Sequence, residues 1–196
     1  MHLCESTFHQ DPRQFRVGEL PDRAYFIPYT EGEIIGKTRE TSKLFHSLNG
    51  AWRFLWKPSL YQMDDFYKAG YDASAFETIS VPENWQLHGA DQAQYQSSPY
   101  PFIFDPPRVP EKNPAAAYIR DFDIPVKPGK RYELHFEGKD SCIHVWLNGA
   151  FVGYSEAPHN RSSFDITKLL RSGKNRLCVI TPINTVKPKP SVQHAA

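Results

Sequence analysis

Hydrophobic and polar residues alternate with a period of two along much of residues 131–180, which is the pattern of β-strands. Two runs rich in β-branched and aromatic residues flank Asn148-Gly149. Asn and Gly accept the positive φ that both central positions of a type I′ turn require, so this stretch predicts a β-hairpin. The first run is apolar or aromatic on both of its faces, so we expect that strand to be covered on both sides. One face carries Ile143, Val145 and Leu147, and the other carries Cys142, His144 and Trp146.

The segments around this hairpin continue the pattern. Gly153 interrupts the second arm, where a bulge or a close neighbouring backbone is expected. Residues 131–137, 164–166 and 176–180 are further strand candidates, and a turn or short helix that ends at Gly173 joins the last two. The section predicts antiparallel β-structure with short connections.

Three more strands are predicted upstream. Residues 51–56 place three aromatic side chains on one face, which we interpret as core residues: Trp52, Phe54 and Trp56. The runs at 76–81 and 117–124 each stop at a proline, which cannot donate to a β-ladder. Residues 63–71 predict a short helix or an irregular loop.

Three stretches lack this period. Residues 1–43 are interpreted as an N-terminal arm, mobile or docked on another body, in which residues 23–29 offer an apolar anchor. Residues 82–116 form a long, proline-rich loop, and loops of that length are usually functional. Residues 181–196 predict an extended, disordered tail. The β-sandwich itself is placed at residues 44–180.

Composition agrees with an all-β fold, because 17 prolines and 11 glycines suit many short strands and turns. The 23 basic and 22 acidic residues nearly cancel and form no basic stripe, which argues against a nucleic-acid partner. No apolar run reaches the length of about 18 residues that a membrane span needs. The first five residues lack the features of a signal peptide, so a cytoplasmic location is expected.

Cysteines and histidines give no metal-binding pattern. The three cysteines lie far apart without a C-x-x-C spacing, and the two within strand patterns are interpreted as buried thiols. The histidines show no helical i, i+4 pairing. The residues considered are Cys4, Cys142, Cys178, His88, His135, His144 and His159.

A series of motifs carries a specific family resemblance. The chain resembles the N-terminal sugar-binding domain of glycoside hydrolase family 2, in its β-galactosidase branch, over roughly residues 20–180. That domain is a galactose-binding-domain-like jelly roll, so the resemblance implies the same β-sandwich here. The matching motifs are Ser47-Leu48-Asn49-Gly50, Val81-Pro82-Glu83-Asn84-Trp85, Phe136-Glu137-Gly138, Val145-Trp146-Leu147-Asn148-Gly149, Val152-Gly153-Tyr154-Ser155, Phe164-Asp165-Ile166-Thr167 and Gly173-Lys174-Asn175-Arg176-Leu177.

The resemblance also implies where catalysis occurs. In family members the two catalytic glutamates, with the magnesium and sodium ions, lie in a later (β/α)₈ barrel that nothing in these residues matches. The chain is therefore expected to be an N-terminal piece that cannot hydrolyse glycosides alone, and whose partners are the barrel and, in the parent enzyme, further copies. A glycosidase needs two facing carboxyl groups, but the acids of the long loop, Glu83, Asp91, Asp105 and Glu111, are interpreted as solvated or capping groups.

A few residues are predicted to contact sugar. The family places an asparagine in the sugar pocket where this chain has Ser97, whose shorter side chain still offers a donor and an acceptor. Tyr95 and Tyr100 lie beside it. The family's Ser-Asp-Gly-Ser segment is missing. Two alternatives stay open: a free-standing carbohydrate-binding module that stacks sugars on Trp85, Tyr95 and Tyr100, and a fragment that complements an enzyme lacking this domain.

Overall fold

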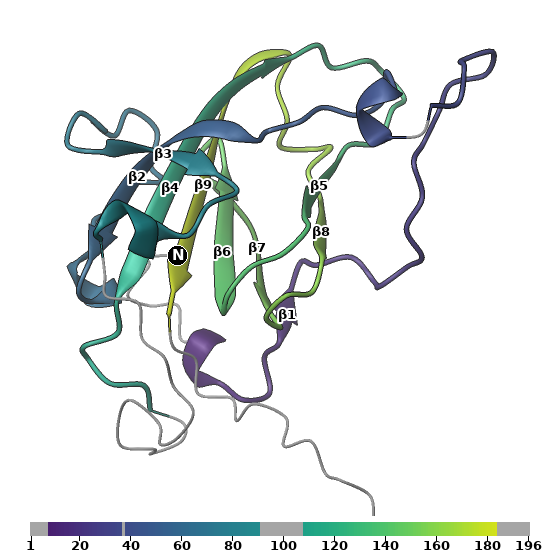
Figure 1. The fold of residues 1–196 in the computed structure, drawn as a ribbon. Coiled ribbons are helices and arrows are strands. Elements are labelled where there is room, and N and C mark those ends of the chain that lie inside the picture. The colour runs from purple at the N-terminus through teal and green to yellow at the C-terminus, as the bar shows by residue number, and fades with distance from the viewer. Residues whose placement is uncertain (1–7, 37, 91–107, 184–196) are drawn as a thin grey trace, which may run out of the picture.

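The computed structural model describes residues 8–36, 38–90 and 108–183. Within them the chain forms two antiparallel β-sheets (Figure 1). The larger sheet has seven strands in the order β1-β7-β6-β9-β4-β2-β3, and β5 and β8 form the smaller one. The strands are β1 Arg16–Val17, β2 Gly50–Lys57, β3 Glu77–Val81, β4 Ala115–Ile124, β5 Glu133–Phe136, β6 Cys142–Leu147, β7 Ala150–Glu156, β8 Ser162–Asp165 and β9 Gly173–Pro182.

The only helical turns in the described residues are short 3₁₀ segments. The predicted all-β sandwich is therefore confirmed. Residues 63–71, for which a short helix or an irregular loop was predicted, form an irregular loop. The 3₁₀ segments are η2 Phe8–Gln10, η3 Arg39–Thr41, η4 Leu60–Gln62 and η5 Trp85–His88. No helix in this part of the chain has the length and apolar character needed to cross a membrane.

The predicted hairpin is β6–β7. Its two turn residues have positive φ, 54° at Asn148 and 86° at Gly149, as a type I′ turn requires. All six residues of β6 are buried. The prediction that this strand is covered on both sides is confirmed.

Both features that Gly153 suggested, a β-bulge and a close neighbouring backbone, are present in the structure. The pairing of β6 with β7 shifts register between Val145 and Trp146, which is the signature of a β-bulge. A Cβ on Gly153 would also collide with the backbone oxygen of Val17 and lie 2.6 Å from Cε1 of Phe164. The absent side chain thus allows β1 and the smaller sheet to approach β7 closely.

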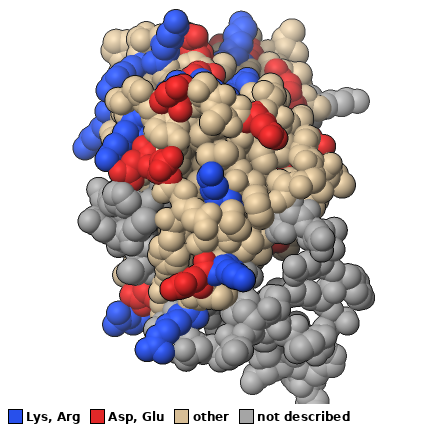
Figure 2. Space-filling view, turned by 90° about the vertical axis from the view of Figure 1, so that its left-hand side faces the viewer, with Lys and Arg blue, Asp and Glu red and all other residues tan. Residues whose placement is uncertain are grey.

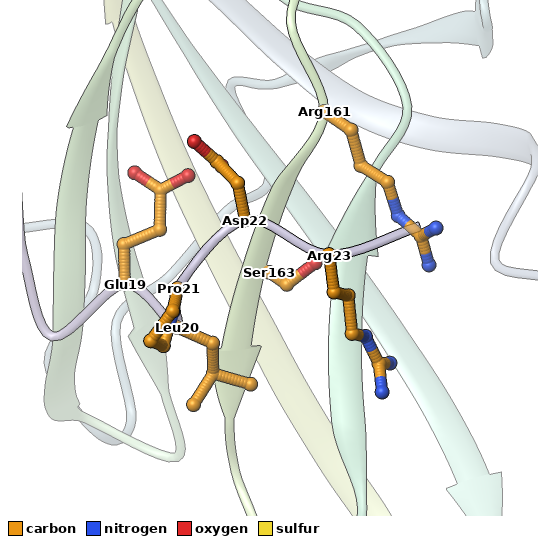
Figure 3. Close-up of a pocket in the computed structure, with 7 residues that line it drawn as sticks. All are labelled: Glu19, Leu20, Pro21, Asp22, Arg23, Arg161 and Ser163. Carbon is orange, nitrogen blue, oxygen red and sulfur yellow. The ribbon is translucent and has the colours of Figure 1, made fainter. Parts of the chain in front are cut away.

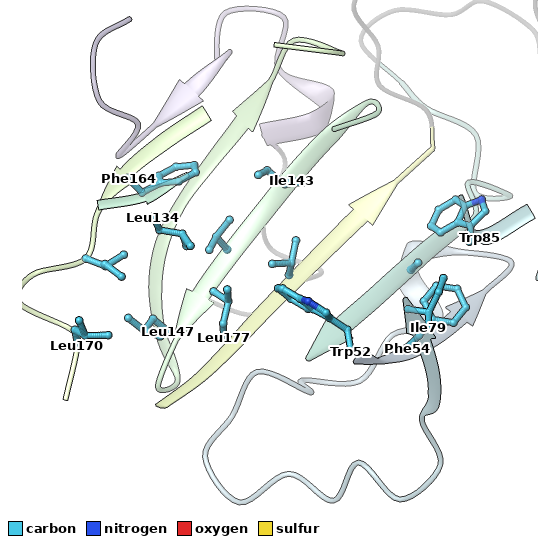
Figure 4. Packing of buried hydrophobic residues seen from close by; sticks show 14 residues of the cluster. Trp52, Phe54, Ile79, Trp85, Leu134, Ile143, Leu147, Phe164, Leu170 and Leu177 are labelled. Carbon is cyan, nitrogen blue, oxygen red and sulfur yellow. The ribbon is translucent and has the colours of Figure 1, made fainter. Parts of the chain in front are cut away.

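One hydrophobic core lies between the two sheets (Figure 4). Its buried aromatic side chains come from β2, η5 and β8, and its buried aliphatic side chains come from β3, β4, β5, β6, β9 and the turn before β9. Trp52 and Phe54 are buried in it and Trp56 packs against it, which confirms that these three aromatics are core residues. Its buried members include Trp52, Phe54, Ile79, Trp85, Leu134, Ile143, Val145, Leu147, Phe164, Leu177 and Val179.

A second core covers the opposite face of the larger sheet. The irregular segment 58–76, which includes η4, folds over β4, β6 and β9 there and contributes Leu60, Met63, Phe66 and Tyr67. These side chains pack on Trp146 and on apolar residues of β4 and β9. Both predicted core thiols, Cys142 and Cys178, are buried, and neither is part of a disulfide.

The N-terminal segment lies against this domain. β1 pairs with β7, and the backbone N–H of Leu20 donates to Ser163 O at 2.7 Å. The apolar anchor predicted at residues 23–29 is wrong, because Tyr25 and Phe26 keep 57% and 52% of their surface exposed. Arginine side chains lie over these two rings instead.

The last strand runs beyond the predicted boundary. β9 continues past Ile180 to Pro182, which pairs with Ala115 of β4. Proline is accepted here because strand pairing between β6 and β9 has already ended at His144 and Ile180. The tail predicted after Ile180 falls mostly outside the described residues.

Candidate functional site

The residues predicted to contact sugar, Tyr95, Ser97 and Tyr100, lie outside the described residues, as do Asp91 and Asp105. The structure does describe both ends of the segment that carries them, residues 84–90 and 108–114. We call residues 84–90 the first root and residues 108–114 the second root, and the contacts of each root show how the sandwich holds it.

The first root is the single turn η5. Trp85 is only 6% exposed and packs into the core, with its ring 6.4 Å from that of Phe54. The turn ends at Gly89, whose φ of 73° is left-handed and whose N–H donates to Gln86 O. A buried Trp85 cannot serve as a stacking surface for sugar rings, so that part of the carbohydrate-binding-module hypothesis is wrong.

Glu83 and His88 close this root with a polar contact. Oε2 of Glu83 lies 3.0 Å from Nε2 of His88, and each side chain is about one third exposed. The contact brackets η5 and gives the Glu83 carboxylate a local partner. This arrangement suits a structural role for Glu83 better than a role in a catalytic carboxyl pair.

The second root is fixed by backbone contacts. Ser59 Oγ donates to Glu111 O at 2.6 Å, and the N–H of Leu60 donates to Asn113 O at 3.0 Å. The N–H of Ile183 donates to Pro114 O at 2.9 Å, immediately before β4 begins. Glu111 is exposed, as predicted for a solvated acid. Both ends of the segment are thus held by the sandwich.

A small pocket lies between the N-terminal segment and β8 (Figure 3). Its cavity volume is about 50 Å³, enough for a few waters but well below the roughly 300–1,000 Å³ of ordinary ligand sites. Its lining residues are Glu19, Leu20, Pro21, Asp22, Arg23, Arg161 and Ser163.

The charged side chains that line this pocket form ion pairs with other groups of the protein. Glu19, whose side chain is 2% exposed, lies 3.6 Å from the guanidinium of Arg16, and Arg23 donates to Glu133 on β5. Arg161 lies 3.8 Å from Glu137. We interpret the pocket as part of the polar contact between residues 19–23 and the smaller sheet, and not as a sugar site.

The four histidines considered from sequence lie apart in the fold. His135 contacts Ser163 Oγ at 2.8 Å, and burial lowers its pKa. His144 is fully buried, whereas His159 is exposed. The described residues contain no group of three or more His, Cys, Asp or Glu side chains that could hold a metal ion.

Charged side chains are interspersed on the surface. On the face shown in Figure 2, basic groups follow the upper left edge with acidic groups beside them, both signs lie together near the base, and the area between is mostly uncharged.

Sequence comparison identifies the family. A family model described as "Glycosyl hydrolases family 2, sugar binding domain" matches residues 45–191. The chain is 42% identical over 176 residues to a β-galactosidase of Actinobacillus pleuropneumoniae and 37% identical over 181 residues to one of Staphylococcus xylosus. These alignments cover 89% and 91% of this chain, but only 17% and 18% of the two relatives.

Solved structures agree on the fold. A glycosyl hydrolase family 2 member from Bacteroides cellulosilyticus matches with a TM-score of 0.53 at 19% identity, covering 72% of this chain and 18% of that one. A β-glucuronidase of Bifidobacterium dentium matches with a TM-score of 0.51 at 21% identity, covering 69% of this chain and 19% of that one. At such identities the likeness establishes the fold alone.

The chain belongs to the sugar-binding domain family of the family 2 glycosyl hydrolases. Its relatives by sequence are β-galactosidases, and it spans less than a fifth of their length.

Proposed function

We propose that this chain is the sugar-binding and supporting domain of a family 2 β-galactosidase, and that it hydrolyses no glycoside by itself. The observation that carries the proposal is 42% identity to a β-galactosidase over nearly the whole chain, within an alignment that covers only 17% of that enzyme. The bond-breaking carboxyl groups then belong to the part of the enzyme that these 196 residues do not align with.

The contacts of the two roots support the proposal that this domain holds part of the sugar site in place. The predicted sugar contacts Tyr95, Ser97 and Tyr100 lie within residues 91–107. The sandwich holds the residues that flank this segment on both sides. Trp85 fixes the first root in the core, and Asn113 and Pro114 accept backbone hydrogen bonds at the second. Binding residues are commonly carried on loops that a rigid scaffold positions, and the flanking residues described above belong to such a scaffold.

Two assays test the proposal. The purified 196-residue chain should show no turnover of a nitrophenyl β-galactoside. A chimera in which this chain replaces the matching segment of the Actinobacillus pleuropneumoniae β-galactosidase should hydrolyse the same substrate. The control is that enzyme with the segment deleted, which should be inactive.

The outcomes separate the alternatives. Turnover by the chain alone, abolished by a point change within it, would falsify the proposal. A folded but inactive chimera would also count against it. If the separate chain restores activity when mixed with the deleted enzyme, it acts as a complementing fragment, as well as a covalent domain.

Ser97 is the position at which a sugar contact can be tested directly. We propose that its hydroxyl replaces a longer amide, so Ser97→Asn in the chimera should lower the KM for the galactoside and leave kcat largely unchanged, because uniform binding affects KM alone. The matched control is Ser98→Asn. Equal effects of the two substitutions would remove Ser97 from the sugar site.

A further inference from the structure

The first described residues of the chain cover the outer face of the β6–β7 hairpin. The ring of Phe8 lies 5.5 Å from that of Tyr154 and 6.1 Å from that of Phe151. Its neighbour His9 is only 3% exposed. Downstream, the N–H of Glu156 donates to Phe15 O at 3.0 Å, and Arg16 and Val17 pair with Ser155 and Tyr154. Residues 8–17, which we call the docking segment, therefore lie along β7.

A histidine lies under this segment. His144 on β6 is 0% exposed, with its ring 4.7 Å from Tyr154 and 6.1 Å from Trp146 on the sheet side. On the other side the rings of Phe8 and His9 lie 6.2 Å and 6.1 Å away. The docking segment thus separates the imidazole of His144 from water.

Several titratable groups lie around His144. Among the described residues, Tyr154 faces it from β7 and His9 faces it from the docking segment, while the neighbouring pair Cys142 and Glu156 lies two residues further along the two strands. The Tyr154 hydroxyl donates to Glu156 Oε2 at 2.6 Å, so this carboxylate already has a partner. Burial first, and then the charge of His9, lower the pKa of His144 to about 3.

The docking segment is easier to release than the sheet beneath it. β1 pairs with β7 over only two residues, whereas β6 is paired along its length with β7 and also with β9. Short, singly paired elements open locally at lower cost than a central strand. Opening the segment would detach the edge strand β1 and uncover His144, and would leave the other six strands of the larger sheet paired.

We propose that His144 and the docking segment form an acid-sensitive latch: at neutral pH the segment is docked over a neutral imidazole, and acidification releases residues 8–17 before the sandwich unfolds.

The direction follows from proton linkage. The pKa of His144 is about 3 when the segment is docked, and an imidazole in contact with water titrates near the ordinary value of 6.5. Above that value neither state binds the proton and docking is at full strength. As the pH falls below about 6.5 the released state binds more protons, so the ratio of docked to released segment falls by up to about tenfold per pH unit. The loss ends near the docked pKa.

Hydrogen exchange on the full chain at pH 7 and pH 5, corrected for intrinsic exchange rates, tests the latch. The amides of residues 15–17, which belong to the part of the docking segment that pairs with β7, should lose protection at pH 5 while those of β6 and β9 keep theirs. The variant His144→Phe, which keeps an aromatic ring but cannot be protonated, should retain protection of residues 15–17 at pH 5. His159→Asn serves as a control and should behave as the wild type, because His159 is exposed with a positive φ that Asn tolerates.

The same hydrogen-exchange measurements can also contradict the latch. Protection of residues 15–17 that is independent of pH, or that falls equally in His144→Phe, excludes the latch. If His144→Phe does not fold, the imidazole of His144 is followed by NMR in the wild type. Its titration should share one midpoint with the loss of protection, and a midpoint that coincides with global unfolding would overturn the proposal.

Discussion

The ring of Tyr67 stacks on the indole of Trp146, with centroids 4.6 Å apart and planes 13° from parallel. Tyr67 belongs to the irregular segment 58–76, and Trp146 lies on the outer face of β6. Both side chains are buried. This contact joins a segment without regular structure to the centre of the larger sheet, and aromatic pairs in such geometry add to the stabilisation that burial supplies.

Replacing Trp146 should therefore strongly destabilise the domain. Trp146→Ala removes the stacked pair and leaves a cavity in the outer core, for which a loss of about 3–5 kcal/mol in the free energy of unfolding is expected. Urea unfolding followed by circular dichroism measures it. Leu87→Ala is the control, since Leu87 is exposed and should change stability by less than about 0.5 kcal/mol. Equal losses in the two variants would contradict the packing described for Trp146.

The strands could be predicted because their signals are local. Asn148-Gly149 meets a φ requirement of the turn itself, and the two-sided apolar pattern of residues 142–147 follows from burial on both faces. The segment 58–76 carries no such period. Its fold depends on contacts with strands far away in the sequence, such as the stacking of Tyr67 on Trp146, and these have no local signature.

Gly153→Ala should test the close approach of three elements at β7. The new methyl group would collide with the backbone of Val17 and the ring of Phe164, so β1 or β8 must shift. A loss of about 1–3 kcal/mol is expected, as for other insertions into packed sites.

Gly138→Ala is the matched control for this prediction. A Cβ at Gly138 meets no atom within 4 Å, so this substitution should be nearly neutral. Thermal unfolding of both variants decides the matter, and equal melting temperatures would show that the approach of β1 to β7 is not tight.

The candidate site was less predictable than the fold. Trp85 looked like a loop aromatic because a proline and polar residues surround it, yet it is a core residue that anchors the loop. The covering of His144 by Phe8 and His9 was also missed, since residues 1–20 show no period. The assignments of Tyr95, Ser97 and Tyr100 rest on family resemblance and stay predictions.

Asn148 has a second role beyond its turn conformation. Its Nδ2 donates to Leu169 O at 2.9 Å and to Asn175 Oδ1 at 2.8 Å, while its Oδ1 accepts from the N–H of Arg176 at 3.0 Å. The side chain thus ties the hairpin turn to the turn before β9 and to the first half of β9 itself. Asn148→Gly keeps the positive φ and removes these hydrogen bonds, so a loss of about 1–3 kcal/mol is expected from the hydrogen bonds alone.

Asn148→Ala should cost more than Asn148→Gly, because alanine is strained at a φ of 54°. Asn160→Ala, at an exposed position, should be close to neutral. Chemical unfolding of the three variants measures this order. A glycine variant as stable as the wild type would show that the side-chain hydrogen bonds contribute nothing.

The two buried thiols should resist modification in the folded protein. Burial raises the pKa of Cys178 to about 12 from the ordinary value of 9.0, which lowers its thiolate fraction at pH 8 about 1,000-fold, and the thiolate is the reactive form. In a Cys4→Ser background, Ellman's reagent should therefore label neither Cys142 nor Cys178 in the native state and both in guanidinium. Adding Lys168→Cys at an exposed position supplies the reactive control. Rapid native labelling of Cys178, at the rate of the control cysteine, would mean that segment 58–76 does not cover the sheet as described.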